Sequence, residues 1–129
     1  MDYIIENPDM LEAFKSVAYI NVKKLPGLTK SNHYNISIAY NKYKNILLKQ
    51  IKYYNPDIII GGSTLHNFFP DLNIKKCELV RFDNFKYAIK NDRIYIDAFH
   101  PAQFTTTRDK YCDEIIQIVK IGLSNNQIQ

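Results

Sequence analysis

Apolar residues recur at three- and four-residue spacing over residues 36–54. The apolar positions of this stretch are Ile36, Ala39, Tyr40, Tyr43, Ile46, Leu47, Ile51 and Tyr54. This spacing gathers the apolar side chains on one face of an α-helix, so it predicts a long amphipathic helix. Asn55 and Pro56 end this helix, because a proline restricts the residue before it to extended geometry.

Two further helices are predicted towards the ends of the chain. The first covers residues 9–15, where Asn7 or Asp9 can cap the first turn. The second covers residues 109–122, and its expected buried stripe consists of Tyr111, Ile115, Ile118, Val119 and Leu123.

Three stretches rich in β-branched and aromatic residues predict strands, at residues 16–22, 57–60 and 93–99. The second of these is a continuous apolar run, which is typical of a strand covered on both faces. The third ends at His100-Pro101. These strands alternate with the predicted helices along the chain.

The pattern is weaker between the second and third strands. Gly61-Gly62 end the second strand, and Ser63 or Thr64 can cap a short helix after it. Residues 77–92 alternate too poorly to distinguish irregular chain from a short strand over residues 79–82.

The order of these elements predicts an α/β fold, a small three-layer αβα domain with a mainly parallel sheet of three to four strands. A length of 129 residues fits a single domain over residues 1–129. No apolar run approaches the roughly 18 to 20 residues that cross a bilayer, and the N-terminus has no signal-peptide pattern. The expected location is therefore the cytoplasm, without membrane contact.

Charge and cysteine content narrow the chemistry only slightly. A net charge of +4 is compatible with a polyanionic partner such as nucleic acid, without requiring one. Cys77 and Cys112 lack a Cys-x-x-Cys spacing, so neither a metal site nor a disulfide framework is expected.

Ligands of parallel sheets bind beyond the carboxyl ends of the strands, where residues 21–27, 61–64 and 99–102 are expected to face one crevice. His100 precedes a proline, which fixes its backbone, and its side chain serves either a structural hydrogen bond or a ligand. Asn21 lies inside an apolar strand and makes either a cross-strand bond or a contact to a base. The Gly-Gly-Ser-Thr turn serves either close packing or phosphate binding.

Three segments together resemble the uracil-DNA glycosylase superfamily. They are Tyr19-Ile20-Asn21-Val22-Lys23-Lys24-Leu25-Pro26-Gly27, then Pro56-Asp57-Ile58-Ile59-Ile60-Gly61-Gly62, then Ile96-Asp97-Ala98-Phe99-His100-Pro101-Ala102. In the shorter microbial and archaeal-type branches an Asn-Val-x-Lys strand, a Pro-Lys/Asp-hydrophobic-Gly strand and a His-Pro-Ser/Ala motif follow one another. The similarity extends from residue 17 to residue 119.

This resemblance implies a four-stranded parallel sheet between helices and a pocket for a pyrimidine flipped out of uracil-containing or damaged DNA, in base-excision repair. Asn21 matches the asparagine that reads the pyrimidine. His100 matches the catalytic histidine that donates to uracil O2 and stabilises the departing base. Phe104 occupies the place of the wedge that enters the duplex. The residues expected to contact DNA are Lys23, Lys24, Gly62, Ser63, Phe104 and Arg108.

The chain also departs from this family. The cysteines of the iron–sulfur branch are absent, so no cofactor is expected. The family's first strand and its Gly-x-x-Pro loop, which supplies the water-positioning acid, are not found, and Asp2, Glu6 and Asp9 lie in no matching motif. The chain is therefore either a truncated piece of a longer glycosylase-like protein or a shortened relative without hydrolytic activity.

Such a shortened relative would bind a nucleobase, a nucleotide, nucleic acid or another protein without turnover. A sheet that lacks an interior strand would leave unpaired edges, so a homo-oligomer is also compatible with the sequence. A third hypothesis is a small α/β hydrolase or phosphate-binding domain built on Gly61-Gly62-Ser63. It is the least favoured, because the chain lacks the Gly-x-Ser-x-Gly elbow and the Gly-x-x-x-x-Gly-Lys loop.

Overall fold

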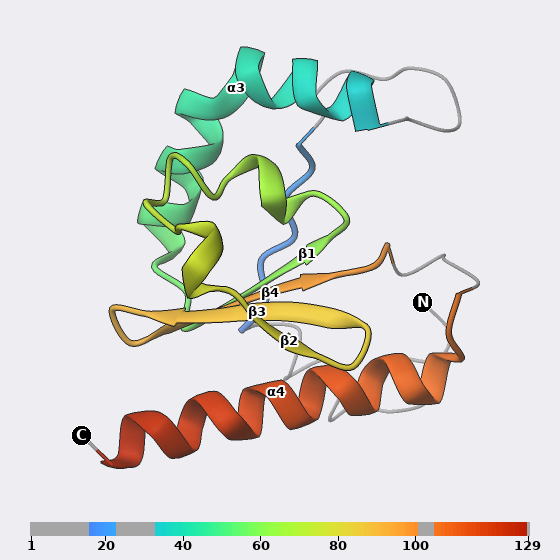
Figure 1. Cartoon of the computed structure of the whole chain (residues 1–129). Coiled ribbons are helices and arrows are strands. Elements are labelled where there is room, and N and C mark those ends of the chain that lie inside the picture. The colour runs from blue at the N-terminus through green and yellow to red at the C-terminus, as the bar shows by residue number, and fades with distance from the viewer. Residues whose placement is uncertain (1–15, 23–32, 101–104, 129) are drawn as a thin grey trace. The chain divides into compact units, whose positions relative to one another are not determined.

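Figure 1 shows a computed structural model of the chain, which describes residues 16–22, 33–100 and 105–128. The chain divides into two compact units at the boundary between Tyr54 and Asn55. We call them the N-terminal unit and the C-terminal unit and describe each by itself. The predicted helix over residues 9–15 lies outside the described residues.

The main element of the N-terminal unit is helix α3, His33–Tyr54, which confirms the long helix predicted from apolar spacing. Its buried side chains are Ala39, Tyr40, Leu47 and Ile51, all members of the predicted stripe. Asn55 follows with a φ of 44°, a left-handed conformation that commonly ends helices, and Pro56 prevents continuation.

The strand predicted over residues 16–22 is wrong, because these residues form no regular secondary structure. Val17 and Tyr19 are 63% and 84% exposed. High β-propensity reflects how well a side chain fits a half-buried pleated surface, and these side chains have no such surface. Asn21 is exposed as well, so it is not an amide enclosed in a buried strand.

The C-terminal unit contains a four-stranded sheet in the order β1-β4-β3-β2. Its strands are β1 (Ile58–Gly62), β2 (Val80–Phe82), β3 (Phe85–Lys90) and β4 (Arg93–Ala98). The strands predicted at residues 57–60 and 93–99 are confirmed as β1 and β4. Of the residues of β1, Ile60 is half exposed, so the expectation of a strand covered on both faces is wrong for this edge strand.

The sheet is mixed, and the prediction of a mainly parallel sheet is wrong. Only β1 and β4 are parallel, whereas β2 with β3 and β3 with β4 are antiparallel. Two-residue connections, Asp83-Asn84 and Asn91-Asp92, join these antiparallel strands. Asp83, Asn91 and Asp92 have positive φ, which Asn and Asp tolerate and which tight hairpins require.

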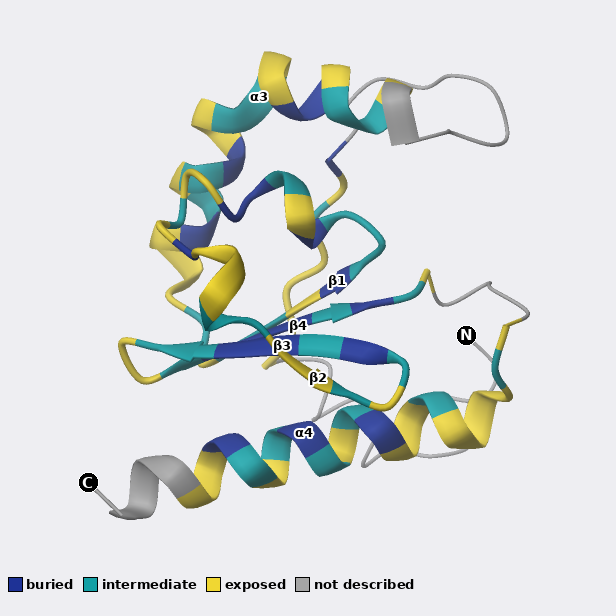
Figure 2. Cartoon of the chain, in the orientation of Figure 1, coloured by how far each residue is buried: buried dark blue, intermediate teal, exposed yellow. Residues whose placement is uncertain are grey.

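Each face of the sheet is covered by a different kind of structure (Figure 1). Helix α4, Arg108–Ile128, packs on one face over a core of Phe85, Tyr87, Ile94, Ile96, Ala98 and Ile118. The segment between β1 and β2 covers the other face and contains two short 3₁₀ helices, η1 (Leu65–Asn67) and η2 (Lys76–Glu78). Figure 2 shows the buried side of α4 turned towards the sheet.

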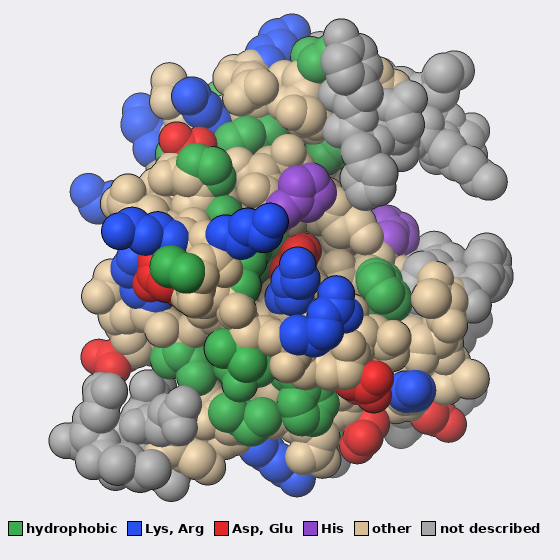
Figure 3. Space-filling view, in the orientation of Figure 1, with side chains coloured by type: hydrophobic (Ala, Val, Ile, Leu, Met, Phe, Trp, Pro, Cys, Tyr) green, Lys and Arg blue, Asp and Glu red, His purple; other side chains and the backbone are tan. Residues whose placement is uncertain are grey.

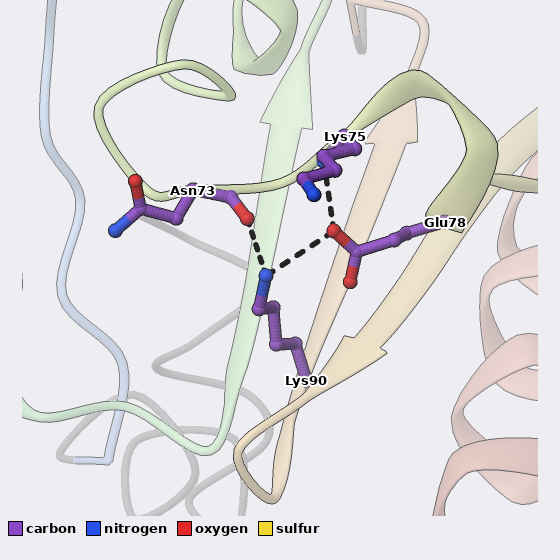
Figure 4. A network of polar contacts seen from close by, with 4 residues as sticks. All are labelled: Asn73, Lys75, Glu78 and Lys90. Carbon is purple, nitrogen blue, oxygen red and sulfur yellow. Dashed lines mark hydrogen bonds and ion pairs between the residues drawn. The ribbon is translucent and has the colours of Figure 1, made fainter.

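A polar network holds the η2 segment against β3 (Figure 4). Lys90 of β3 donates to Glu78 Oε1 at 3.2 Å and to the carbonyl oxygen of Asn73. The Lys75 N–H donates to the same Glu78 oxygen at 2.9 Å. The bond from Lys75 and the charge of Lys90 hold the pKa of Glu78 below its usual value.

Helix α4 is longer than predicted, and its buried side differs from the predicted stripe. Leu123 is 50% exposed, whereas Gly122 and Glu114 are buried.

None of the described helices combines the length and the apolar character needed to cross a membrane.

Gly122 lies where α4 comes closest to β4. A Cβ atom added there would be 2.3 Å from Ile94 Cδ1, whose side chain is fully buried in the core. In an exposed helix, Gly→Ala stabilises by about 1 kcal/mol. At this position we expect Gly122→Ala to destabilise the protein by about 1–3 kcal/mol, because overpacking outweighs helix propensity.

Urea unfolding of Gly122→Ala, compared with Ser124→Ala at an exposed position of α4, measures this difference. A Gly122→Ala variant as stable as the wild type would show that α4 does not pack on Ile94 as described.

Glu114 is a buried carboxyl group on α4, with 3% of its surface exposed. Asn84 Nδ2 in the β2–β3 turn donates to its Oε1 at 2.8 Å. Burial and the neighbouring Asp83 raise the pKa of Glu114 above its usual value of 4.5. Asp83 itself forms an ion pair with Lys110 at 3.8 Å.

This raised pKa makes the stability of the protein depend on pH. Because ionisation is less favourable in the folded state, Glu114 weakens stability as the pH rises above 4.5 and has no such effect well below it. Glu114→Gln should therefore be more stable than the wild type near neutral pH and equal to it in acid. Thermal unfolding across this range tests the effect, with the exposed Asp113→Asn as control. A difference independent of pH would contradict it.

Candidate functional site

The carboxyl ends of β1 and β4 lie side by side because these two strands are parallel, with Gly62 paired to Ala98. Beyond them, the Ser63 N–H donates to the Ala98 carbonyl oxygen at 2.8 Å. The His100 N–H donates to Ser63 Oγ at 3.2 Å. The structure thus brings together three of the predicted site residues, Gly62, Ser63 and His100, and we call their position the His100 edge.

The Gly61-Gly62 pair serves close packing. A Cβ atom at Gly61 would be 2.4 Å from Leu65 Cβ and 2.8 Å from Leu65 N. The left-handed residue of the turn is Ser63, with a φ of 62°. The predicted helix cap is wrong, because Thr64 makes no side-chain cap hydrogen bond and the Ser63 hydroxyl accepts from His100 instead.

Only the three-residue 3₁₀ helix η1 follows this turn. Phosphate binding at a helix N-terminus depends on aligned peptide dipoles over a longer helix. The structure therefore provides no basis for the phosphate-turn hypothesis built on Gly61-Gly62-Ser63.

The residue before His100 is anchored on the α4 side of the sheet. The Tyr111 hydroxyl donates to the Phe99 carbonyl oxygen at 2.7 Å. Phe85 packs edge-to-face against both Phe99 and Tyr111, with centroid distances of 5.1 and 5.2 Å. Burial raises the pKa of Tyr111, so its hydroxyl keeps the proton that it donates. The peptide group between Phe99 and His100 is therefore held by both Ser63 and Tyr111.

The structure adds a polar group that the sequence did not suggest. Asp97 of β4 lies directly opposite Lys86 of β3 and Gly61 of β1. Burial raises the pKa of Asp97, while the nearby His66 and Lys86 act in the opposite direction. An Asp inside the apolar run of β4, shortly before His100, was the available sequence signal.

The structure describes two further predicted site residues, Asn21 and Arg108. Asn21 belongs to the N-terminal unit, and Lys23, Lys24 and Phe104 lie outside the described residues. Gly62 ends β1 at the His100 edge, and Arg108 is exposed at the start of α4. His100 itself is exposed.

The described residues suggest no metal centre. Among them, no group of three or more His, Cys, Asp or Glu side chains is arranged to hold a metal ion. Cys77 and Cys112 are both exposed free thiols. The polar side-chain groups described at and near the His100 edge are an imidazole, a hydroxyl, a carboxyl and an amine, from His100, Ser63, Asp97 and Lys86.

Comparison of the chain with protein-family models, with curated proteins and with solved structures finds no match. The relation to the uracil-DNA glycosylase superfamily is thus a resemblance carried by the three sequence segments.

The bond between His100 and Ser63 can be tested directly. Ser63→Ala removes the acceptor of the His100 N–H but keeps a Cβ, so the strain of the left-handed backbone is unchanged. We expect a loss of about 1 kcal/mol in stability and up to roughly tenfold faster exchange of the His100 amide hydrogen.

Amide hydrogen exchange measured by NMR provides the test, and Thr64→Ala is the matched control because its side chain makes no cap bond. Equal protection of His100 in both variants would mean that Ser63 does not hold the edge.

Proposed function

We propose that the His100 edge binds a pyrimidine base flipped out of DNA, as in the uracil-DNA glycosylase superfamily that the chain resembles. The observation that carries this proposal is the parallel pairing of β1 and β4. It brings two of the three motif-bearing segments to one edge, where the bond between His100 and Ser63 joins them. The antiparallel β2 and β3 depart from the parallel sheet that the resemblance implies.

The chemistry of the edge supports recognition of a base carbonyl. An imidazole N–H can donate to a pyrimidine oxygen and stabilise negative charge that develops on it. The peptide group between Phe99 and His100 is already held at both of its polar atoms, since its N–H donates to Ser63 Oγ and its carbonyl oxygen accepts from the Tyr111 hydroxyl. Because the backbone that carries the His100 imidazole is held in advance, binding of a base costs less conformational entropy there than on a mobile loop, and the hydrogen bond contributes more to affinity.

The net charge of +4 supports DNA as the partner. Arg108 is exposed at the first turn of α4, as a phosphate contact requires. The family's role for Asn21, reading the pyrimidine, remains part of the proposal.

Hydrolysis requires one group more than recognition does. Water attacks the sugar carbon, the bond to the base nitrogen breaks with its electron pair leaving on the base, and a general base accepts the proton of water. Along the chain, the nearest carboxyl group before His100 is Asp97, whose side chain lies on the face with His66 and Lys86.

A second candidate function is recognition of a base without turnover, because the three segments that carry the resemblance contain no match to the family's water-positioning acid. In that case the protein would bind DNA through the same edge and leave the glycosidic bond intact. The two candidates share the role of His100 and differ in the released product.

Binding of oligonucleotides that carry either a uracil or an abasic site, which lacks the base oxygen, is followed by fluorescence anisotropy at low salt and tests the role of His100. We expect the wild type to prefer the uracil strand and His100→Ala to lose this preference. The loss should be roughly tenfold or more, the worth of one hydrogen bond to a base. Lys120→Ala, an exposed change on α4, should keep the preference.

Strand cleavage at newly formed abasic sites, measured on the uracil-containing oligonucleotide, separates the two candidates. Release of uracil by the wild type indicates a glycosylase, and preferential binding without release indicates the binding protein. Equal affinity of the wild type for both strands would contradict base recognition in either form.

A further inference from the structure

A row of charged side chains crosses the sheet near the His100 edge. Arg81 of β2 lies directly opposite Lys86 of β3, which lies directly opposite Asp97 of β4. Directly opposite residues point to the same face, and their neighbours Phe85, Ile96 and Ala98 are buried under α4. These three side chains, which we call the charge row, therefore lie on the face away from α4.

The charge row lies at the same end of the sheet as His100. Asp97 is the last residue but one of β4, and Lys86 is the second residue of the antiparallel β3. His100 is three positions after Asp97, which in extended chain corresponds to roughly 10 Å. A strand of nucleic acid with a base at His100 would therefore have its backbone within reach of this face.

The positive charges of Arg81 and Lys86 repel each other in the folded protein when no anion is bound. Like charges directly opposite each other on neighbouring strands destabilise a sheet. Within the described part of the chain, neither Arg81 nor Lys86 forms an ion pair. Arg81 instead donates to the carbonyl oxygen of Asp83, a neutral acceptor.

Other cations of the same sheet and helix do have carboxylate partners. Lys90, at the far end of β3, is paired with Glu78 at 3.2 Å (Figure 4). Lys110 of α4 is paired with Asp83 at 3.8 Å. Arg93, which lies directly opposite Lys90, donates to the Pro56 and Asn55 oxygens. In that pair of cations one member has a carboxylate partner, whereas in the pair of Arg81 and Lys86 neither has one within the described part of the chain.

Asp97 does not neutralise the pair. It lies beside Lys86 but forms no ion pair with it among the described residues, and burial disfavours its charged form. His66 also lies close to Asp97 and lowers the pKa of its carboxyl, against the effect of burial. Figure 3 shows Lys and Arg side chains gathered near acidic and histidine side chains on this side of the protein.

We propose that Arg81 and Lys86 form a phosphate-binding site for one phosphodiester group of a nucleic-acid strand. Cβ atoms of opposite residues lie about 5 Å apart, so the guanidinium and the ammonium group can both reach one phosphate. The fork of an arginine and the point charge of a lysine both suit phosphate oxygens. This inference rests on the proposed function in taking nucleic acid as the source of the phosphate.

Charge reversal at Arg81 provides a test in which stability and binding change in opposite directions. Arg81→Glu places a carboxylate opposite Lys86, so the melting temperature should stay the same or rise. The affinity for a short single-stranded DNA without uracil should fall by about tenfold or more, with a smaller dependence on salt. The matched control is Lys120→Glu on the exposed side of α4.

A second variant, Lys86→Gln, removes the other cation without adding a negative charge. We expect it to weaken binding by less than Arg81→Glu does and by more than Lys120→Gln does. Equal affinities of the Arg81 and Lys120 variants would overturn the phosphate site. Failure of the wild type to bind any strand at low salt would overturn it as well.

The same variants distinguish this inference from the proposed base recognition. Arg81→Glu should weaken binding of the uracil strand and of the abasic strand equally and keep the ratio of their affinities, whereas His100→Ala changes the ratio. If the wild type binds both strands equally and Arg81→Glu still loses affinity for them, the result supports the phosphate site and contradicts the base pocket. If Arg81→Glu loses binding to vesicles that contain phosphatidylserine but keeps its binding to DNA, the ligand of Arg81 and Lys86 is a lipid phosphate. That outcome would overturn a nucleic-acid strand as their ligand.

Discussion

The parallel ladder between β1 and β4 aligns Ile58 with Ile94 and Gly62 with Ala98. Because both strands run in the same direction, both end at one edge, where the His100 N–H donates to the Ser63 hydroxyl and the Ser63 N–H donates to the Ala98 carbonyl oxygen. Hydrogen bonds between strands fix position to within a fraction of an ångström, which flexible surface loops do not. The candidate chemistry of the protein therefore depends on the pairing of two strands.

The alternation of side chains along β4 connects the core with the polar face. Ile94, Ile96 and Ala98 are buried under α4, and the residues between them point to the opposite face. A shift of one residue in the pairing of β4 would place Asp97 in the core. Such a shift is costly, because burying a carboxyl group removes its contacts with water. The hydrophobic core thus specifies which charged groups reach the surface near His100.

Local patterns anticipated much of this fold and little of its topology. The spacing of apolar residues is sufficient for α3 and α4, and the apolar runs are sufficient for β1 and β4, because these signals depend on neighbours along the chain. The strand β3 was not anticipated, since short hairpins at Asp83-Asn84 and Asn91-Asp92 interrupt its pattern. Residues 16–22 show the reverse, a strand-like composition without a surface on which to pack.

The sequence by itself determined that Pro56 ends a helix, that an apolar strand follows it, and that a second strand leads to His100. Tertiary structure alone decided which groups meet there. Ser63 and His100 are 37 residues apart along the chain, and Arg81, Lys86 and Asp97 become neighbours only through strand register. Register is set by packing of the whole sheet against α4, and no local pattern contains that information.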